Sequence, residues 1–252
     1  MAEIDLANEF PELYEFFGNH PASRPDGGEI WERVLRAARN SKPMLDDIRA
    51  RGLNLVWLEQ YTPASTDRRP LYEAVLQWLP RIQDSLTLSI CLGRLLEPRA
   101  RPLVKKNREV LLNLAKEWNE RLRDCDRERT LAVLAQCVMR AALERDLPQF
   151  LICARDPRLP TEARASYVID LERFARKPGR ARDALFELAR DAFVGSAAVW
   201  AIAGALKTDA LPALYELRDS SEHELVRKTA STAARKVEAR TRRDSRNRQL
   251  DA

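Results

Sequence analysis

The feature that most constrains the fold of this chain is a proline at the start of an apolar helix, repeated at a fixed interval. Arg69-Pro70-Leu71 and Arg101-Pro102-Leu103 stand 32 residues apart, and Leu147-Pro148 and Leu211-Pro212 stand 64 apart, twice that interval. Proline is accepted in the first turn of a helix because the N–H that it lacks has no partner there. A unit of this length holds two helices and their turns, so the spacing predicts a stack of helix pairs.

The last repeat has the clearest pattern. Its first half places leucines on one helical face over residues 209–218, and residues 219–222 supply a polar turn. Its second half repeats apolar residues at spacings of four, three and four, the period of one helical face: Val226, Ala230, Ala233 and Val237. The two faces predict one amphipathic helix hairpin.

Earlier segments repeat this hairpin. A shift of 63 residues places Ala163 and Tyr167 on the apolar series and aligns Arg164 with Arg227. The pattern Leu-Pro-x-Leu, an aspartate at the inter-helix turn, then Val-Arg and a run of alanines resembles the HEAT repeat, most clearly over residues 147–238. The resemblance implies an α-solenoid that most often binds proteins, and less often binds nucleic acid or is an enzyme. We therefore expect an all-α fold, an α-solenoid of about six to seven antiparallel HEAT-like helix pairs with no β-sheet.

We expect one continuous structural domain with three parts. Residues 1–62 form an irregular helical N-terminal cap, in which Gly18 and Gly52 end helices. Residues 63–239 form the HEAT-like repeats, and residues 240–252 form a basic, flexible C-terminal tail. Aromatic residues cluster in the cap, where they either fill a core or make an exposed contact site: Phe10, Tyr14, Phe16, Phe17, Trp31, Trp57 and Tyr61.

Residue types that most enzymes need are scarce. The chain has two histidines, His20 and His223, and no glycine-rich phosphate loop. The acidic residues have no spacing that sets them apart from a solvated helix face. The four cysteines stand singly, unlike the close pairs of a zinc site. We therefore predict a protein without catalytic residues, metal site or cofactor.

Several features favour a cytoplasmic location. The chain opens with the acidic segment Met1–Asp5, whereas a secretion signal has a basic and then apolar start. Isolated cysteines are typical of buried free thiols in a reducing compartment. The longest uncharged stretch, residues 193–206, has 14 residues, fewer than the roughly 18–20 that span a bilayer. We therefore predict no membrane span.

Positive charge is concentrated near the C-terminus. The whole chain has a net charge of +5, whereas residues 227–248 alone hold nine cations and two acidic residues. Such a segment either binds the phosphate backbone of nucleic acid or is a solvated end that keeps the protein soluble. The candidate basic surface consists of Arg227, Lys228, Arg235, Arg240, Arg242, Arg243, Arg246 and Arg248.

A second candidate surface is the uncharged stretch from Phe193 to Leu206. A 32-residue shift places small or apolar residues where residues 223–238 carry charges, which predicts a groove for a partner protein. Burial by a neighbouring loop or helix is the alternative. The candidate groove consists of Gly195, Ser196, Val199, Trp200 and Ala203. We predict a non-enzymatic protein–protein interaction or scaffold module, with nucleic-acid binding through the basic C-terminus as the alternative.

Overall fold

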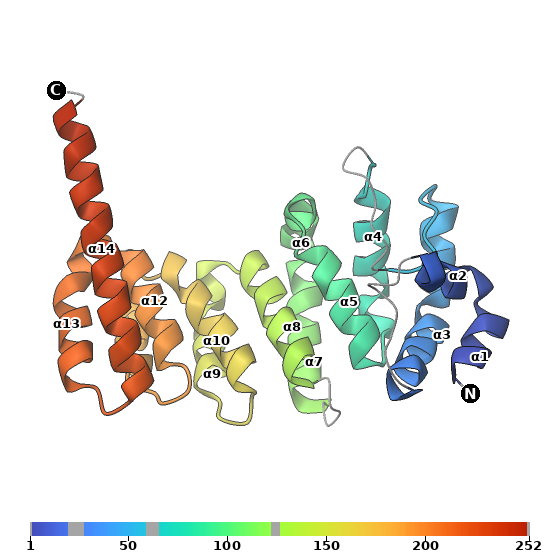
Figure 1. Ribbon diagram of the computed structural model, residues 1–252, viewed down its shortest axis with the longest axis horizontal. Helices are drawn as coiled ribbons and strands as arrows, with labels where there is room; N and C mark the ends of the chain where they lie inside the picture. The colour runs from blue at the N-terminus through green and yellow to red at the C-terminus, as the bar shows by residue number, and fades with distance from the viewer. Residues whose placement is uncertain (1, 20–27, 59–65, 122–126, 251–252) are drawn as a thin grey trace. The chain divides into compact units, whose positions relative to one another are not determined.

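The computed structural model of the protein describes residues 2–19, 28–58, 66–121 and 127–250 (Figure 1). Every regular element in these ranges is a helix and none is a strand, which confirms the predicted all-α fold. The chain forms two compact units, residues 1–141 and 142–252. This division falls inside the stretch 63–239 that we predicted as one run of repeats, and each unit is therefore described by itself.

Unit 1 is built from α-helices and short 3-10 helices (η) in close succession. They are α1 (Ala2–Glu9), α2 (Pro11–Asn19), α3 (Gly28–Ala50), α4 (Arg69–Trp78), η2 (Leu79–Arg81), α5 (Ser85–Leu95), η3 (Pro98–Ala100), α6 (Arg101–Lys106), α7 (Arg108–Arg121) and α8 (Arg127–Ala141).

Unit 2 has three helix hairpins in sequence, α9 with α10, α11 with α12 and α13 with α14, whose members pack against each other. Its elements are η4 (Glu144–Asp146), α9 (Leu147–Arg155), α10 (Thr161–Asp170), η5 (Leu171–Arg173), α11 (Arg180–Leu188), α12 (Gly195–Leu206), η6 (Lys207–Ala210), α13 (Leu211–Ser220) and α14 (Glu224–Leu250).

The repeated prolines open helices as predicted. Pro70, Pro102, Pro148 and Pro212 lie in the first turn of α4, α6, α9 and α13. Midway between Pro148 and Pro212, α11 begins just after Gly179. The φ of Gly179 is 145°, a backbone conformation that residues with a side chain rarely adopt. The sequence spacing therefore identified helix starts in both units.

The N-terminal region differs in part from its prediction. Gly52 ends α3 as expected: its φ is 91°, and the Leu53 N–H donates to the Ile48 carbonyl at 3.2 Å. Gly18 instead lies within α2, which continues to Asn19. Phe17, Trp31 and Trp57 are buried and pack edge to face, so these three aromatic residues belong to the core of unit 1. Tyr61 lies outside the described residues.

The second helices of the hairpins in unit 2 run parallel and side by side. Along α12 and α14, Ser196 contacts Thr229, Trp200 contacts Lys236, and Thr208 of η6 contacts Thr241, so positions advance together on both helices. All four apolar residues predicted for the inner face of α14 are buried: Val226, Ala230, Ala233 and Val237. Parallel second helices bring their C-terminal ends to one edge of the unit.

In unit 1, α8 packs along α5 in a similar way. The Thr130 hydroxyl donates to the Ser85 carbonyl at 3.1 Å, and the Cys137 thiol to the Leu92 carbonyl at 3.3 Å. Both spacings are seven residues, two helical turns, which keeps the contacts on one face of each helix.

Candidate functional site

The groove predicted on α12 is filled. Gly195, Val199 and Ala203 are buried, and their helix packs against α10, α11 and α14. A Cβ atom at Gly195 would lie 2.7 Å from Val226 Cγ2 and 2.9 Å from the Ala189 carbonyl oxygen. The small residues of α12 therefore allow neighbouring helices to approach closely, and burial, the alternative reading, is correct for these three positions.

Two residues of the predicted groove reach the surface of unit 2. Trp200 keeps 38% of its surface exposed, and Lys236 Nζ lies 4.5 Å from the centre of its ring. Ser196 is half-buried, and its hydroxyl accepts from Thr229 at 3.2 Å. Seven residues before Trp200, in the turn that precedes α12, Phe193 is 69% exposed. Two exposed aromatic residues therefore remain on and beside α12, whereas three residues of the predicted groove are buried.

Several residues of the predicted basic surface are engaged within unit 2. Arg227 donates to the Ser221 carbonyl at 2.7 Å and to the Glu222 carbonyl at 3.1 Å, at the end of α13. Lys228 pairs with Glu224 at 2.6 Å, and Arg235 donates to Ser231. Arg227 is therefore a capping residue and does not belong to an open basic surface.

The remaining cations lie on the last turns of α14. Arg242 is 3.8 Å from Glu238, whereas Arg240, Arg243 and Arg246 are exposed and make no ion pair among the described residues. We predicted residues 240–252 as a flexible tail, but α14 continues as a helix to Leu250. Arginine is a good helix former, and the Glu238–Arg242 pair at i, i+4 supports the continuation. The side chain of Arg248 lies outside the described residues.

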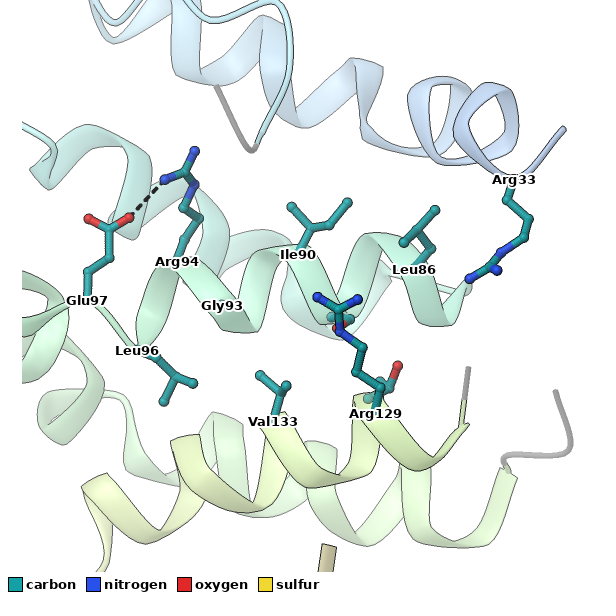
Figure 2. Close-up of a pocket in the computed structure, with 11 residues that line it drawn as sticks. Arg33, Leu86, Ile90, Gly93, Arg94, Leu96, Glu97, Arg129 and Val133 are labelled. Atoms are coloured by element: carbon teal, nitrogen blue, oxygen red, sulfur yellow. Dashed lines mark hydrogen bonds and ion pairs between the residues drawn. The ribbon is translucent and has the colours of Figure 1, made fainter. Parts of the chain in front are cut away.

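Unit 1 contains a groove that the sequence did not predict. It follows the outer side of α5, between α3 and α8, and encloses about 380 Å³ (Figure 2). Its floor and lower wall are apolar: Leu86, Ile90, Leu96 and Val133. In the middle lies Gly93, where an added Cβ would meet nothing within 4 Å. We call this feature the α5 groove.

One end of the α5 groove is closed by a carboxylate that accepts three hydrogen bonds. Glu97 accepts from Arg94 at 2.9 Å, Arg68 at 2.6 Å and the Tyr72 hydroxyl at 2.6 Å. Burial alone would raise the pKa of Glu97, but these hydrogen bonds outweigh it and hold the pKa below its ordinary value. Burial, together with Glu97, raises the pKa of Tyr72 to about 12. The hydrogen bonds fix this end of the groove, where two guanidinium groups face one carboxylate.

The other end of the α5 groove is cationic. Figure 2 shows Arg33 reaching from α3 and Arg129 from α8 toward the half of α5 that carries Leu86. Arg129 is exposed and has no ion pair among the residues that the structure describes. The α5 groove therefore combines an apolar middle with the hydrogen-bonded Glu97 cluster at one end and Arg33 and Arg129 at the other.

The sequence contained one signal for the α5 groove. Gly93 is a glycine inside a helical pattern, which costs stability relative to alanine and so singles out its position. The arginines carried no signal, because Arg33, Arg94 and Arg129 come from three helices that are far apart in sequence.

The described residues offer little acid–base or redox chemistry. No group of three or more His, Cys, Asp or Glu residues among them is placed to hold a metal ion. His223 is half-buried at the start of α14, and His20 lies outside the described residues, as does Cys125. Cys91, Cys137 and Cys153 are buried free thiols, and burial raises the pKa of each, to about 12 for Cys137. A protonated, buried thiol is a poor nucleophile.

One continuous run of helical residues, Gly195–Ser220, has the length and apolarity of a membrane span, with a mean hydropathy of 1.2 in its most apolar window. It is not one straight helix, because α12 ends at Leu206 and Lys207 turns the chain with a φ of 54°. The 12 residues of α12 extend about 18 Å, short of the roughly 30 Å of a hydrocarbon core. Seven of these residues are buried, which assigns α12 to the core of unit 2.

Comparisons with protein-family models, with curated proteins and with solved structures find no match to this chain. The arrangement of its own residues is therefore the basis for assigning a function.

Proposed function

We propose that this protein is a non-enzymatic, cytoplasmic α-solenoid of HEAT-like helix pairs, and that it binds a segment of another protein in the α5 groove. The parallel second helices α10, α12 and α14 support a repeated hairpin. So do Arg164 and Arg227, which the 63-residue shift aligns: each donates to a carbonyl at the end of the preceding helix, Ala154 at 3.0 Å and Ser221 at 2.7 Å.

The α5 groove is the observation that carries the binding proposal. Protein-binding sites combine a desolvated apolar centre with a polar rim. Ile90 and Val133 supply the apolar centre, and arginines supply the rim. The volume of about 380 Å³ suits a few side chains of a docked segment and not a whole domain.

Gly93 offers a direct test. Because a side chain added there meets no neighbour, Gly93→Trp fills the α5 groove without disturbing the core, and Gly93→Ala is the matched control that adds one methyl group. We expect a partner that co-purifies in stoichiometric amount with the wild type and with Gly93→Ala to be lost from Gly93→Trp, with unchanged circular dichroism. Retention of the partner by a folded Gly93→Trp protein would contradict binding in this groove.

A further inference from the structure

The two edges of unit 2 carry opposite charge. Because α10, α12 and α14 run parallel, their C-terminal ends share one edge, as the proximity of Glu172 in η5 to Gly204 near the end of α12 confirms. Residues 171–180, 206–210 and 240–246 of this edge hold nine cations and three acidic residues, a net charge of +6. At the opposite edge, residues 156–162, 190–194 and 219–224 hold two cations and six acidic residues, a net charge of −4.

The positive edge is assembled from three connections. We call it the basic edge, and its exposed cations are Arg176, Lys177, Arg180, Lys207, Arg240, Arg242, Arg243 and Arg246. The hydrogen bond between Thr208 and Thr241, at 3.1 Å, brings Lys207 to the point where α14 leaves the other helices of the unit. The cations of α14 were predicted from the sequence. Those of the loop after α10 join them only because the fold brings the two segments to the same edge.

The last turns of α14 project beyond the other helices of unit 2 (Figure 1). The nine residues after Thr241 extend about 13 Å as a helix. Arg243 and Arg246 lie about 200° and 140° around the helix from Thr241, which turns toward Thr208. Their side chains therefore point away from the body of unit 2.

We propose that the basic edge of unit 2 binds duplex DNA, with the projecting end of α14 in the major groove and the loop cations on the phosphate backbones. The major groove of B-form DNA admits one α-helix, whereas that of duplex RNA is too narrow. Arg240, Arg242, Arg243 and Arg246 spread over about 160° of the helix circumference, so they can reach phosphates on both sides of the groove.

Other polyanions fit this surface less well. An interfacial membrane helix needs large apolar residues opposite its cations, and residues 240–249 contain none. Single-stranded nucleic acid is bound through stacked aromatic rings, which the basic edge lacks among its exposed residues. An acidic protein partner would require an apolar interface core, and residues 242–249 of α14 offer no apolar side chain for one.

The test uses the full chain and a fluorescent 20-base-pair duplex of arbitrary sequence, followed by anisotropy at several KCl concentrations. Arg240→Gln/Arg243→Gln/Arg246→Gln should weaken binding in 50 mM KCl at least tenfold, and should reduce the slope of log affinity against log salt by about 2.7 for three lost phosphate contacts. Arg176→Gln/Lys177→Gln should reduce the slope by about 1.8. The control, Lys228→Gln/Arg235→Gln, removes two cations of α14 away from the basic edge and should leave affinity within twofold.

Four outcomes would overturn the proposal: no wild-type binding in 50 mM KCl, an equal loss in the control variant, tighter binding to a single strand of the same length, or tighter binding to vesicles containing 30% phosphatidylserine. Every substituted arginine and lysine is exposed, so each variant should have the circular dichroism spectrum of the wild type. None of them lines the α5 groove, and a loss of DNA binding is therefore separable from a loss of the protein partner.

Discussion

Two helices, α5 in unit 1 and α12 in unit 2, are both largely buried, but their glycines lie in opposite surroundings. Both are apolar and contain glycine. On α12, a Cβ at Gly195 would come within 3 Å of neighbouring atoms, whereas on α5 a Cβ at Gly93 would meet none within 4 Å. Glycine thus marks close helix packing in one unit and an open groove in the other. The difference teaches that a small, uncharged helix face does not itself indicate a binding surface.

The largest loss of stability should follow from placing a charge on the buried face of α12. Val199 is fully buried on α12, and Val199→Glu should lower the free energy of unfolding by about 4 kcal/mol because the carboxylate has no partner there. The counterpart on α5 is Leu86→Glu, which places a carboxylate at the positive end of the α5 groove and should cost less than about 1.5 kcal/mol. Urea unfolding followed by circular dichroism measures both. Equal losses would remove the distinction between the two helices.

The aspartates that precede the two helices should also differ in their contribution to stability. Asp191 accepts from the backbone N–H groups of Phe193 and Val194 and pairs with the buried Arg164 at 2.8 Å. Asp191→Ala should cost about 3 kcal/mol, because it removes two hydrogen bonds of the turn before α12 and leaves a buried guanidinium without its carboxylate. Asp84 caps α5 by accepting from the Thr87 N–H at 2.8 Å and also accepts from the exposed Asn40, so Asp84→Ala should cost about 1 kcal/mol.

The contribution of Asp191 should depend on pH. Burial would raise its pKa, but hydrogen bonds from Val194, Arg164 and Phe193 outweigh burial and lower it. A group with a lowered folded pKa stabilises the protein above the unfolded value of about 3.9, and this stabilisation is lost as pH falls through the folded pKa. The gap in unfolding free energy between wild type and Asp191→Ala should therefore shrink between pH 5 and pH 2. A constant gap would show that the charge of Asp191 contributes nothing.

Adding a methyl group tests the packing of α12 directly. Gly195→Ala should destabilise unit 2 by about 2 kcal/mol, because the new Cβ would meet both Val226 and the backbone of Ala189, which cannot move aside. Trp200, the sole tryptophan in residues 142–252, reports the unfolding of this unit when the other four are replaced by phenylalanine. A neutral Gly195→Ala would mean that α14 is free to shift away from α12.

The same substitution on α5 should have the smallest effect and the opposite sign. Gly93→Ala should stabilise unit 1 by about 0.8 kcal/mol, since alanine favours a helix interior more than glycine and its methyl group meets no neighbour. Thermal unfolding should then show a slightly higher midpoint. A destabilised Gly93→Ala would indicate that the α5 groove is closed in solution.

Much of the helical framework was predictable because it depends on local rules. The first-turn prolines of α4, α6, α9 and α13 and the apolar period of α14 are set by residues close in sequence. The failures are equally local in cause. Gly18 lacks the positive φ of a helix cap and stays within α2, and the arginines after residue 239 are helix formers that continue α14.

The candidate sites required distances between segments that sequence does not supply. From its residue type Arg227 was expected to be a surface cation, yet it donates to two carbonyls and caps α13. Val199 was expected to line a groove, yet the helices packed against α12 bury it completely. In both cases a neighbour from another helix decided what the residue does.

By itself the sequence determined an all-helical chain, the starts of its proline-opened helices and an excess of positive charge near the C-terminus, because each follows from residue type and short-range spacing. Tertiary structure alone decided which helix faces are covered, that α3, α5 and α8 enclose a groove, and that the loop after α10 joins α14 in one basic edge. Exposure and charge clustering depend on which segments become neighbours, and that is fixed by packing.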